Sequence, residues 1–162
     1  MNMFAGLLPG SFFKGVFRMI RKADVSDLNA ITGLALRLWP DNERNTLQDD
    51  IAGIMEKDDA AFFLAEDCEN AVGFAQCQLR YDYVEGTESS PVGYLEGIFV
   101  EETVQGSGVA KALLSACENW AKSQGCREFA SDCELTNEKS LAFHLAVGFT
   151  ESNRIICFTK KL

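Results

Sequence analysis

A glycine-containing loop at residues 104–111, VQGSGVAK, has the residue types of an anion-binding turn. Gly106 and Gly108 let the backbone approach a ligand closely, and an amphipathic helix is predicted directly after them. The free N–H groups at a helix N-terminus point towards an anion, so the loop could hold a pyrophosphate. The same residues could also form nothing more than a tight strand-to-helix turn.

Two familiar nucleotide-binding patterns do not fit this loop. A P-loop requires Gly-Lys-Ser/Thr, whereas Lys111 follows Ala110 and precedes Ala112. A dinucleotide fingerprint requires a third glycine for close helix–strand packing, and Lys111 takes that position, although Asp132 matches the acidic residue expected about twenty residues further on. The mismatch at Lys111 removes NAD and ATP as sources of the phosphate.

Two carboxylates lie where they could bind a cation or accept a proton. Glu96 is in the middle of the apolar stretch GYLEGIFV (93–100), where a lone carboxylate is costly to bury. It either faces water or binds an ammonium group and accepts a proton, directly or through water. Asp132 ends the next predicted strand, near the place where open α/β sheets bind ligands, or it caps a turn. Together the two predict a subsite for a cationic amine.

The hydrophobic pattern supplies the elements that must position these residues. Period-two and mostly apolar runs predict strands over 17–22, 60–67, 71–84, 93–100 and 126–132, and a last hairpin or bent strand over 149–162. Helical spacing predicts helices over 23–39, 46–56, 109–125 and 138–147. The strand–helix–strand crossover at 93–132 implies one parallel strand pair in an otherwise antiparallel sheet.

Length and net charge limit the number of domains and the classes of partner that this protein can have. The 162 residues suit one soluble domain, and 24 acidic against 15 basic residues give a formal net charge of −9. This charge argues against nucleic-acid binding, which needs Lys and Arg to neutralise phosphates. It favours a cationic small molecule, unless the acidity serves solubility alone.

The cysteine pattern and the N-terminal residues argue against a metal site and against a membrane span. The six cysteines form no C-x-x-C pair and His144 is the only histidine, so no metal site is expected and a reducing cytosol fits. The apolar run in residues 1–18 is broken by Pro9, Gly10 and Lys14 and is too interrupted to span a bilayer. Residues 1–18 are set apart as an N-terminal extension, non-native or poorly ordered, and the domain is expected over 19–162.

Several stretches resemble the GCN5-related N-acetyltransferases (GNAT). Residues 105–110, QGSGVA, match the acyl-CoA motif Q/R-x-x-G-x-G/A, and residues 137–149 resemble the N-x-x-x-x-A-x-x-x-x-x-G-F ending of the family. Residues 37–39, 81–100 and 128–149 are most similar to the aminoglycoside 6'-N-acetyltransferases. The resemblance covers 19–162 and implies an α/β (α+β) fold: a mixed, mainly antiparallel sheet with a splayed parallel central strand pair and flanking helices.

The resemblance implies acetyl-CoA as cosubstrate and places it between strands 93–100 and 126–132. The pantetheine arm and acetyl carbonyl would bind backbone groups of Ile98, Phe99 and Val100, with a strand-end N–H, that of Val100, polarising the carbonyl. Asn137 would bond the pantetheine region, cap the following helix, or do both. The pyrophosphate would take the backbone N–H groups of Gly106, Ser107, Gly108, Val109, Ala110 and Lys111, with the Ser107 hydroxyl as a further donor.

The resemblance also implies an acceptor side. Glu96 and Asp132 would face an aminoglycoside, with Trp39 and Tyr83 as sugar-contacting aromatics, although Trp39 at a helix end could equally be a core residue. Asn153 would touch substrate from the last hairpin, with Glu151 as a nearby alternative.

His144 stands where many members of the family have a tyrosine that protonates the departing CoA thiolate. It could donate that proton, or it could pack against Phe143 and Val147 at helical spacing.

The expected function is direct transfer of an acetyl group from acetyl-CoA to the 6'-amine of an aminoglycoside in a ternary complex, giving antibiotic resistance. The sequence places no cysteine beside a histidine as an obvious nucleophile pair, so a covalent intermediate is not expected. A cytoplasmic homodimer is expected, with no nucleic-acid, membrane or metal partner. One alternative keeps the fold and acetylates a polyamine, a small metabolite amine or a peptide N-terminus. A second is an acyl-CoA-binding sensor without turnover.

Overall fold

The computed structural model describes residues 18–68 and 70–162. The extension expected over 1–18 lies outside these residues except for Arg18, which begins the first strand. The elements are β1 (Arg18–Lys22), η1 (Val25–Asp27), α1 (Leu28–Leu38), α2 (Arg44–Met55), β2 (Ala60–Asp67), β3 (Asn70–Arg80), β4 (Val92–Val100), η2 (Glu102–Val104), α3 (Val109–Ser123), β5 (Phe129–Ser131) and α4 (Glu138–Ala146).

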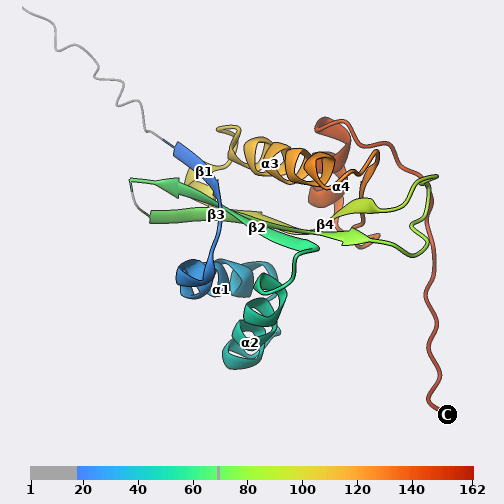
Figure 1. The fold of residues 1–162 in the computed structure, drawn as a ribbon, viewed down its shortest axis with the longest axis horizontal. Coiled ribbons are helices and arrows are strands. Elements are labelled where there is room, and N and C mark those ends of the chain that lie inside the picture. Colours follow the sequence, from blue (N-terminus) through green and yellow to red (C-terminus); the bar gives the residue numbers. More distant parts are fainter. Residues whose placement is uncertain (1–17, 69) are drawn as a thin grey trace, which may run out of the picture.

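One five-stranded sheet in the order β1-β2-β3-β4-β5 forms the middle layer. Neighbouring strands run antiparallel except β4 and β5, which are parallel and joined through α3. Helices α1 and α2 lie on one face of the sheet, and α3 and α4 lie on the other (Figure 1). The predicted α/β class, with a mainly antiparallel sheet and one parallel pair, is confirmed.

Two apolar clusters hold the layers together. Leu113, Leu114 and Cys117 of α3 are buried against one face of the sheet, and Ile31 and Ile51 of α1 and α2 are buried against the other. The central strands are therefore covered on both faces, which explains why β2 reads as an almost continuous apolar run.

The parallel pair is short. β5 has three residues, and its register with β4 covers Gly93↔Phe129, Tyr94↔Ala130 and Leu95↔Ser131. β4 continues to Val100 with β3 on one side and, within the described part of the chain, no paired strand on the other. A gap between the two strands therefore opens directly before the glycine loop.

A β-bulge marks the point where the gap begins. Gln76 pairs with Gly97 and Cys77 pairs with Leu95, so Glu96 has no partner on β3. Gly97 is required at the next position because an added Cβ would lie 2.6 Å from Cζ2 of Trp39. Gly97, directly after the bulge, therefore lies against Trp39, the residue that caps the end of α1.

Two sequence expectations are wrong. β3 ends at Arg80 and not at residue 84, so Tyr83 lies in the loop that leads to β4. The hairpin or bent strand expected over 149–162 does not form, and residues 150–162 are exposed without secondary structure. A strand forms by pairing, and these residues have no backbone neighbour within the described part of the chain.

An ion-pair network fastens β1 to the start of α1. Arg21 donates to both carboxylate oxygens of the buried Asp27 at 2.7 Å and to Glu66 on β2 at 2.8 and 3.0 Å. The hydrogen bonds from Arg21 lower the pKa of Asp27. The lowered pKa means that this carboxylate stabilises the fold above about pH 4, its unfolded value, and that the stabilisation is lost as the pH falls through the folded-state pKa.

Asp27→Asn should lower the free energy of unfolding at pH 7 by about 1.5–3 kcal/mol, because a charge-assisted pair with Arg21 is lost. The deficit should shrink as the pH falls from about 4 through the lowered folded-state pKa, where the wild-type carboxylate also becomes protonated. Urea unfolding at a series of pH values measures both effects. Asp49→Asn, at an exposed position of α2, is the control and should unfold like the wild type. A deficit that stays constant with pH would contradict the assignment.

Candidate functional site

The glycine loop ends in the N-terminus of α3. Gly106 has φ 72° and Gly108, the N-cap, has φ 87°, both in the left-handed region that favours glycine. A Cβ added to either residue would meet nothing within 4 Å. Backbone conformation therefore selects glycine here, and the space next to the loop is open to a ligand.

The backbone N–H groups of this loop are available to an anion. The first helical bond runs from Ala112 N to Gly108 O at 3.0 Å, and no backbone bond of standard geometry ties the N–H groups of 106–111 to another described residue. The first turn of α3 holds no acidic residue, and Lys111 is exposed beside it. The Ser107 hydroxyl donates to the carbonyl of Val104. This cradle fits a diphosphate, with the Ser107 proton used inside the loop.

Strand alternation decides which β4 backbone groups face the gap. Glu101 N donates to Val72 O at 2.8 Å, so the groups of Phe99, two residues earlier, also face β3. Those of Ile98 and Val100 face the gap. The geometry therefore leaves the backbone groups of Ile98 and Val100 open towards the gap, whereas those of Phe99 are used within the sheet.

The motif residue Gln105 connects the gap to the loop. Its side-chain Nε2 donates to the carbonyl of Val100 at 3.1 Å. This bond occupies the Val100 carbonyl and leaves its N–H directed into the gap. The Gln105 side chain therefore fixes the end of β4 relative to the helix N-terminus.

His144 of α4 lies at the root of the gap. Its Nε2 is 2.9 Å from the hydroxyl of Ser131, the last residue of β5, and its Nδ1 is 2.7 Å from the carbonyl of Ser140. Asn137 caps the same helix by accepting from Ser140 N at 3.0 Å, so its predicted capping role is observed. The rings of Phe143 and Phe149 contact the imidazole, which is half-buried.

The hydrogen bond between Ser131 and His144 can form with the imidazole either neutral or charged. A carbonyl can only accept, so Nδ1 carries a proton and donates to Ser140. In the neutral ring, Nε2 accepts from the Ser131 hydroxyl. In the charged ring, Nε2 donates to Ser131, whose hydroxyl can then donate to the Leu95 carbonyl at 3.2 Å. The imidazole is therefore hydrogen-bonded to Ser131 and Ser140 whichever of the two protons Nε2 shares.

Glu96 and Asp132 belong to one continuous polar chain. Arg80 donates to both oxygens of Glu96 at 2.9–3.1 Å, and its guanidinium carbon lies 3.3 Å from the centre of the Tyr94 ring. Tyr94 donates its hydroxyl to Oδ1 of Asp132 at 2.6 Å. The structure thus brings the two predicted carboxylates together through Arg80 and Tyr94.

Sequence reasoning missed Arg80 and Tyr94. Arg80 is the last residue of β3, and Tyr94 lies inside the apolar β4 with 6% of its surface exposed. Burial, followed by the hydrogen bond to Asp132, raises the pKa of Tyr94, which stays protonated and acts as a donor. The available signal for Arg80 is its position as a charged residue at the end of an apolar strand. Its partner Glu96 has no such signal, because their contact depends on the register of β3 and β4 across the bulge.

A second polar cluster gathers Tyr83 and Asn153 around Glu85. Tyr83 donates its hydroxyl to Glu85 at 2.8 Å, and Asn153 donates from Nδ2 to the other oxygen at 3.3 Å. The bond to Glu85 raises the pKa of Tyr83, which is 82% exposed. Glu151, the alternative to Asn153, instead forms an ion pair with Arg154.

Trp39 lies on the α1 side of β4. Its ring contacts the Gly97 backbone and packs edge-on against Phe74 with centroids 6.1 Å apart. The ring is half-buried, so it joins the core and keeps one part exposed. The core role weighed for this residue is therefore observed.

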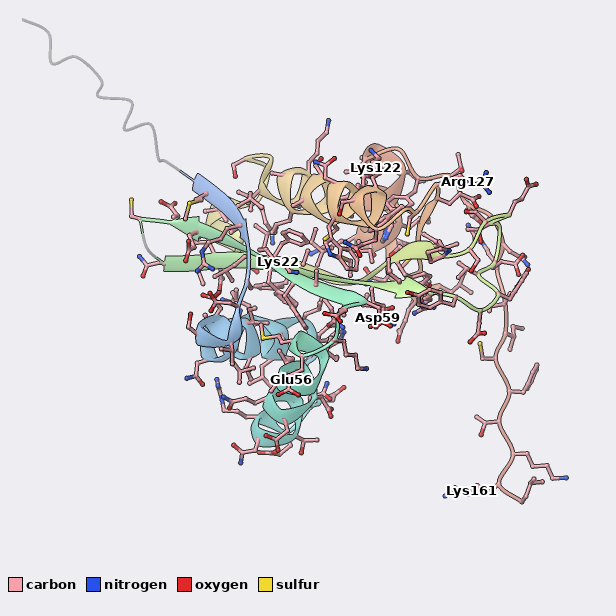
Figure 2. The ribbon with its side chains drawn as sticks, viewed as in Figure 1. Lys22, Glu56, Asp59, Lys122, Arg127 and Lys161 are labelled. Atoms are coloured by element: carbon pink, nitrogen blue, oxygen red, sulfur yellow. The ribbon has the colours of Figure 1, made fainter. Side chains whose placement is uncertain are left out.

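Other parts of the described chain are less suited to the predicted chemistry. A hollow of about 470 Å³ lies between the end of β1 and α2, where Figure 2 labels Lys22 and Glu56, and none of the predicted site residues lines it. Among residues 18–68 and 70–162, no three or more His, Cys, Asp or Glu residues gather as metal ligands. No described helix is long and apolar enough to cross a membrane.

Two bacterial acetyltransferases are similar to this chain in sequence over most of their length. An aminoglycoside N(6')-acetyltransferase type 1 of Stenotrophomonas maltophilia is 43% identical over 143 residues, which cover 88% of this chain and 93% of the relative. The enzyme of the same name from Salmonella typhimurium is 40% identical, with 88% and 98% covered.

Solved structures agree with the sequence relatives. The aminoglycoside N-acetyltransferase AAC(6')-Iy in complex with CoA superposes with a TM-score of 0.89 at 38% identity, covering 96% of this chain and all of that one. Its complex with the bisubstrate analogue CoA-S-monomethyl-acetylneamine gives 0.87 at 39%, covering 90% and 99%. The acetyltransferase (GNAT) family model matches residues 28–149. With the diphosphate cradle beside a strand gap, these matches show that the chain belongs to the GNAT acetyltransferase family.

Proposed function

We propose that this protein transfers the acetyl group of acetyl-CoA to the 6'-amino group of aminoglycoside antibiotics and so confers resistance. The observation that carries the proposal is the open N–H cradle of the glycine loop, placed beside a strand gap that begins at two carboxylates. The relatives at about 40% identity, all named for this reaction, support the same acceptor.

The chain's own residues account for binding of the cosubstrate. Acetyl-CoA supplies the acetyl group as an activated thioester. The N–H groups of 106–111 hold its diphosphate, and backbone groups of Ile98 and Val100 align its pantetheine arm in the gap. The Val100 N–H points to the thioester carbonyl and stabilises negative charge that develops there.

The two carboxylates recognise the cationic acceptor. Tyr94 bonds Oδ1 of the exposed Asp132 and leaves Oδ2 open to an ammonium group. Glu96 accepts the proton that the amine loses, directly or through water, while Arg80 fixes its carboxylate. Tyr83, Asn153 and the exposed part of Trp39 contact the sugar rings.

His144 supplies a proton to the departing sulfur. Ser131 orients the imidazole at the root of the gap, where the sulfur would lie. The amine attacks directly in a ternary complex, since no cysteine–histidine pair is placed to form a covalent intermediate. The domain spans 19–162, and the enzyme acts as a cytoplasmic homodimer.

Release of free CoA thiol from acetyl-CoA tests the proposed acceptor. With kanamycin, spermidine and a peptide panel as acceptors, kanamycin should give the highest kcat/KM, because a polycation complements the paired carboxylates. Turnover with spermidine alone or peptides alone would contradict the aminoglycoside assignment. Tight acetyl-CoA binding without turnover would favour an acyl-CoA sensor.

Asp132→Asn should raise the KM for kanamycin about 10-fold or more and leave the KM for acetyl-CoA within about 2-fold, because it removes a charge-assisted contact with the ammonium group alone. The amide keeps the acceptor for Tyr94, so the surrounding packing is retained. Steady-state kinetics with each substrate varied in turn measure the two constants. An equal rise in both would show that Asp132 is structural.

His144→Gln should lower kcat about 10- to 100-fold with little change in either KM, because the proton donor is lost while the binding groups remain. Ser131→Ala should cause a smaller loss of kcat, since the imidazole stays but is no longer oriented. Leu145→Gln, on the exposed side of the same helix, is the control and should keep full activity. A KM change equal to the kcat change would indicate a packing role.

A further inference from the structure

Gln76 of β3 carries a buried amide that the rest of the described chain leaves unpaired. The other two buried polar side chains of the described residues are bonded: Asp27 accepts from Arg21 at 2.7 Å, and the Thr32 hydroxyl donates to the Leu28 carbonyl at 2.7 Å. The Gln76 side chain is 7% exposed and forms no hydrogen bond with any described residue. Burying an amide without a hydrogen bond is costly, so an ordered water or a ligand group has to satisfy it.

Strand pairing places Gln76 opposite the bulge of β4. Gln76 pairs with Gly97, and an added Cβ at Gly97 would lie 2.6 Å from the ring of Trp39. Residues paired across two antiparallel strands project from the same face, so the Gln76 side chain lies on the face that Trp39 covers. Glu96, the extra residue of the bulge, directly precedes Gly97. The buried amide and the carboxylate of Glu96 therefore come from opposite sides of one bulge.

On this face the neighbours of Gln76 are apolar in every direction but one. Phe62 pairs with it on β2, Phe74 precedes it by two residues on β3, and both are buried in the cluster that packs against α1 and α2. In the other direction along β3, four residues on and so on the same face, lies Arg80, which bonds Glu96. A partner for the amide therefore comes from the side of the Arg80–Glu96 pair.

Glu96 keeps one acceptor position open within the described part of the chain. Its Oε1 accepts from Nε and Nη2 of Arg80 at 3.1 and 2.9 Å, whereas Oε2 accepts only from Nη2, at 3.0 Å. A carboxylate oxygen has two lone pairs, so Oε2 can accept one more hydrogen bond. Gln76 and Glu96 form no direct bond with each other. A water that bonds both groups would satisfy the amide and fill this position.

We propose that Gln76 is a positioning residue that holds a water against Glu96, and that this water carries the proton of the acceptor amine. The proposal rests on the proposed function, in which Glu96 accepts that proton. The Gln76 carbonyl accepts one proton of the water, and the second water proton points to Oε2 of Glu96. A lone pair of the water oxygen then faces the amine.

The transfer leaves the water unchanged. An N–H proton of the amine passes to the water oxygen, and the water proton that faces Glu96 passes to Oε2. The electron pair of the N–H bond forms the new bond to the acetyl carbon, and the sulfur leaves with the electron pair of the C–S bond. Glu96 ends as a neutral carboxyl group that still accepts from Arg80, and Gln76 keeps its bond to the water throughout.

A high-resolution crystal structure of the protein tests the water directly. An ordered water should lie within about 2.7–3.2 Å of both the Gln76 side-chain amide and Oε2 of Glu96. The same water should be lost in Gln76→Met, which keeps the length of the side chain and removes the amide. A Gln76 amide bonded to another protein group, with no water between it and Glu96, would overturn the proposal.

Gln76→Met should lower the single-turnover rate of acetyl transfer to kanamycin about 10-fold and leave both KM values within about 2-fold, because proton removal is slowed while the binding groups remain. The Tm should stay the same or rise by about 2–4 °C, because an amide without a protein partner is replaced by an apolar group. A glutamine with a merely structural role would instead give a lower Tm.

Two further variants sharpen this test. Gln48→Met removes an exposed amide that bonds Asn29 at 2.9 Å, so it is the matched control and should keep the wild-type rate. Gln76→Glu keeps an acceptor oxygen at the same reach and should restore most of the rate lost in Gln76→Met. A wild-type rate in Gln76→Met, or a Gln76→Glu variant as slow as Gln76→Met, would overturn the proposal.

The crystal structure and the thiol-release assay together separate this proposal from the proposed function. Acetylation of kanamycin by a protein that holds no water between Gln76 and Glu96 would refute the water and leave the function standing. The ordered water in a protein that releases no thiol with kanamycin would do the reverse.

Discussion

The end of backbone pairing between β4 and β5 is the constraint on which the rest of the site depends. After Leu95 and Ser131, β4 keeps its bonds to β3 while its other edge is left open. Unpaired N–H and C=O groups are tolerated in a folded protein only where water or a ligand satisfies them. In the proposed function, the same divergence would supply polar groups for the cosubstrate, a place for its diphosphate at the N-terminus of α3, and room for an acceptor amine.

Charge at the acceptor side is balanced more closely than the overall −9 suggests. Glu96 is already bonded to Arg80, Glu151 to Arg154, and Glu85 is shared by Tyr83 and Asn153. Asp132 is the carboxylate that keeps one oxygen open. The ammonium groups of a polycation must therefore compete with arginine side chains of the protein, so its binding does not depend on net charge alone. At Glu96 an ammonium group must compete with the fixed guanidinium of Arg80.

Elements with local signals could be predicted from the sequence. β2 can be predicted at its observed bounds because it is an apolar run, and Asn137 and Gly108 can be located because caps and left-handed turns have strong residue preferences. Pairing across the sheet has no such local signal. The link from Arg80 to Glu96 depends on a bulge that shifts the register, and the side of β4 that Phe99 faces depends on the same shift. The C-terminal tail has a strand pattern but not the neighbour that would make it a strand.

The bulge at Glu96 has a consequence for which changes β4 can accept. Leu95, Ile98 and Val100 all pack on the α3 side, although an uninterrupted strand would separate Leu95 from the other two. The extra residue therefore reverses the in–out phase of the strand halfway along its length. Deleting Glu96 would restore regular pairing and leave Leu95, Ile98 and Val100 on the α3 side, with the loss of the carboxylate itself. Loss of the Glu96 codon would thus keep the in–out pattern of β4 and remove one carboxylate of the site, whereas a one-residue slip of the strand against β3 would turn its side chains over.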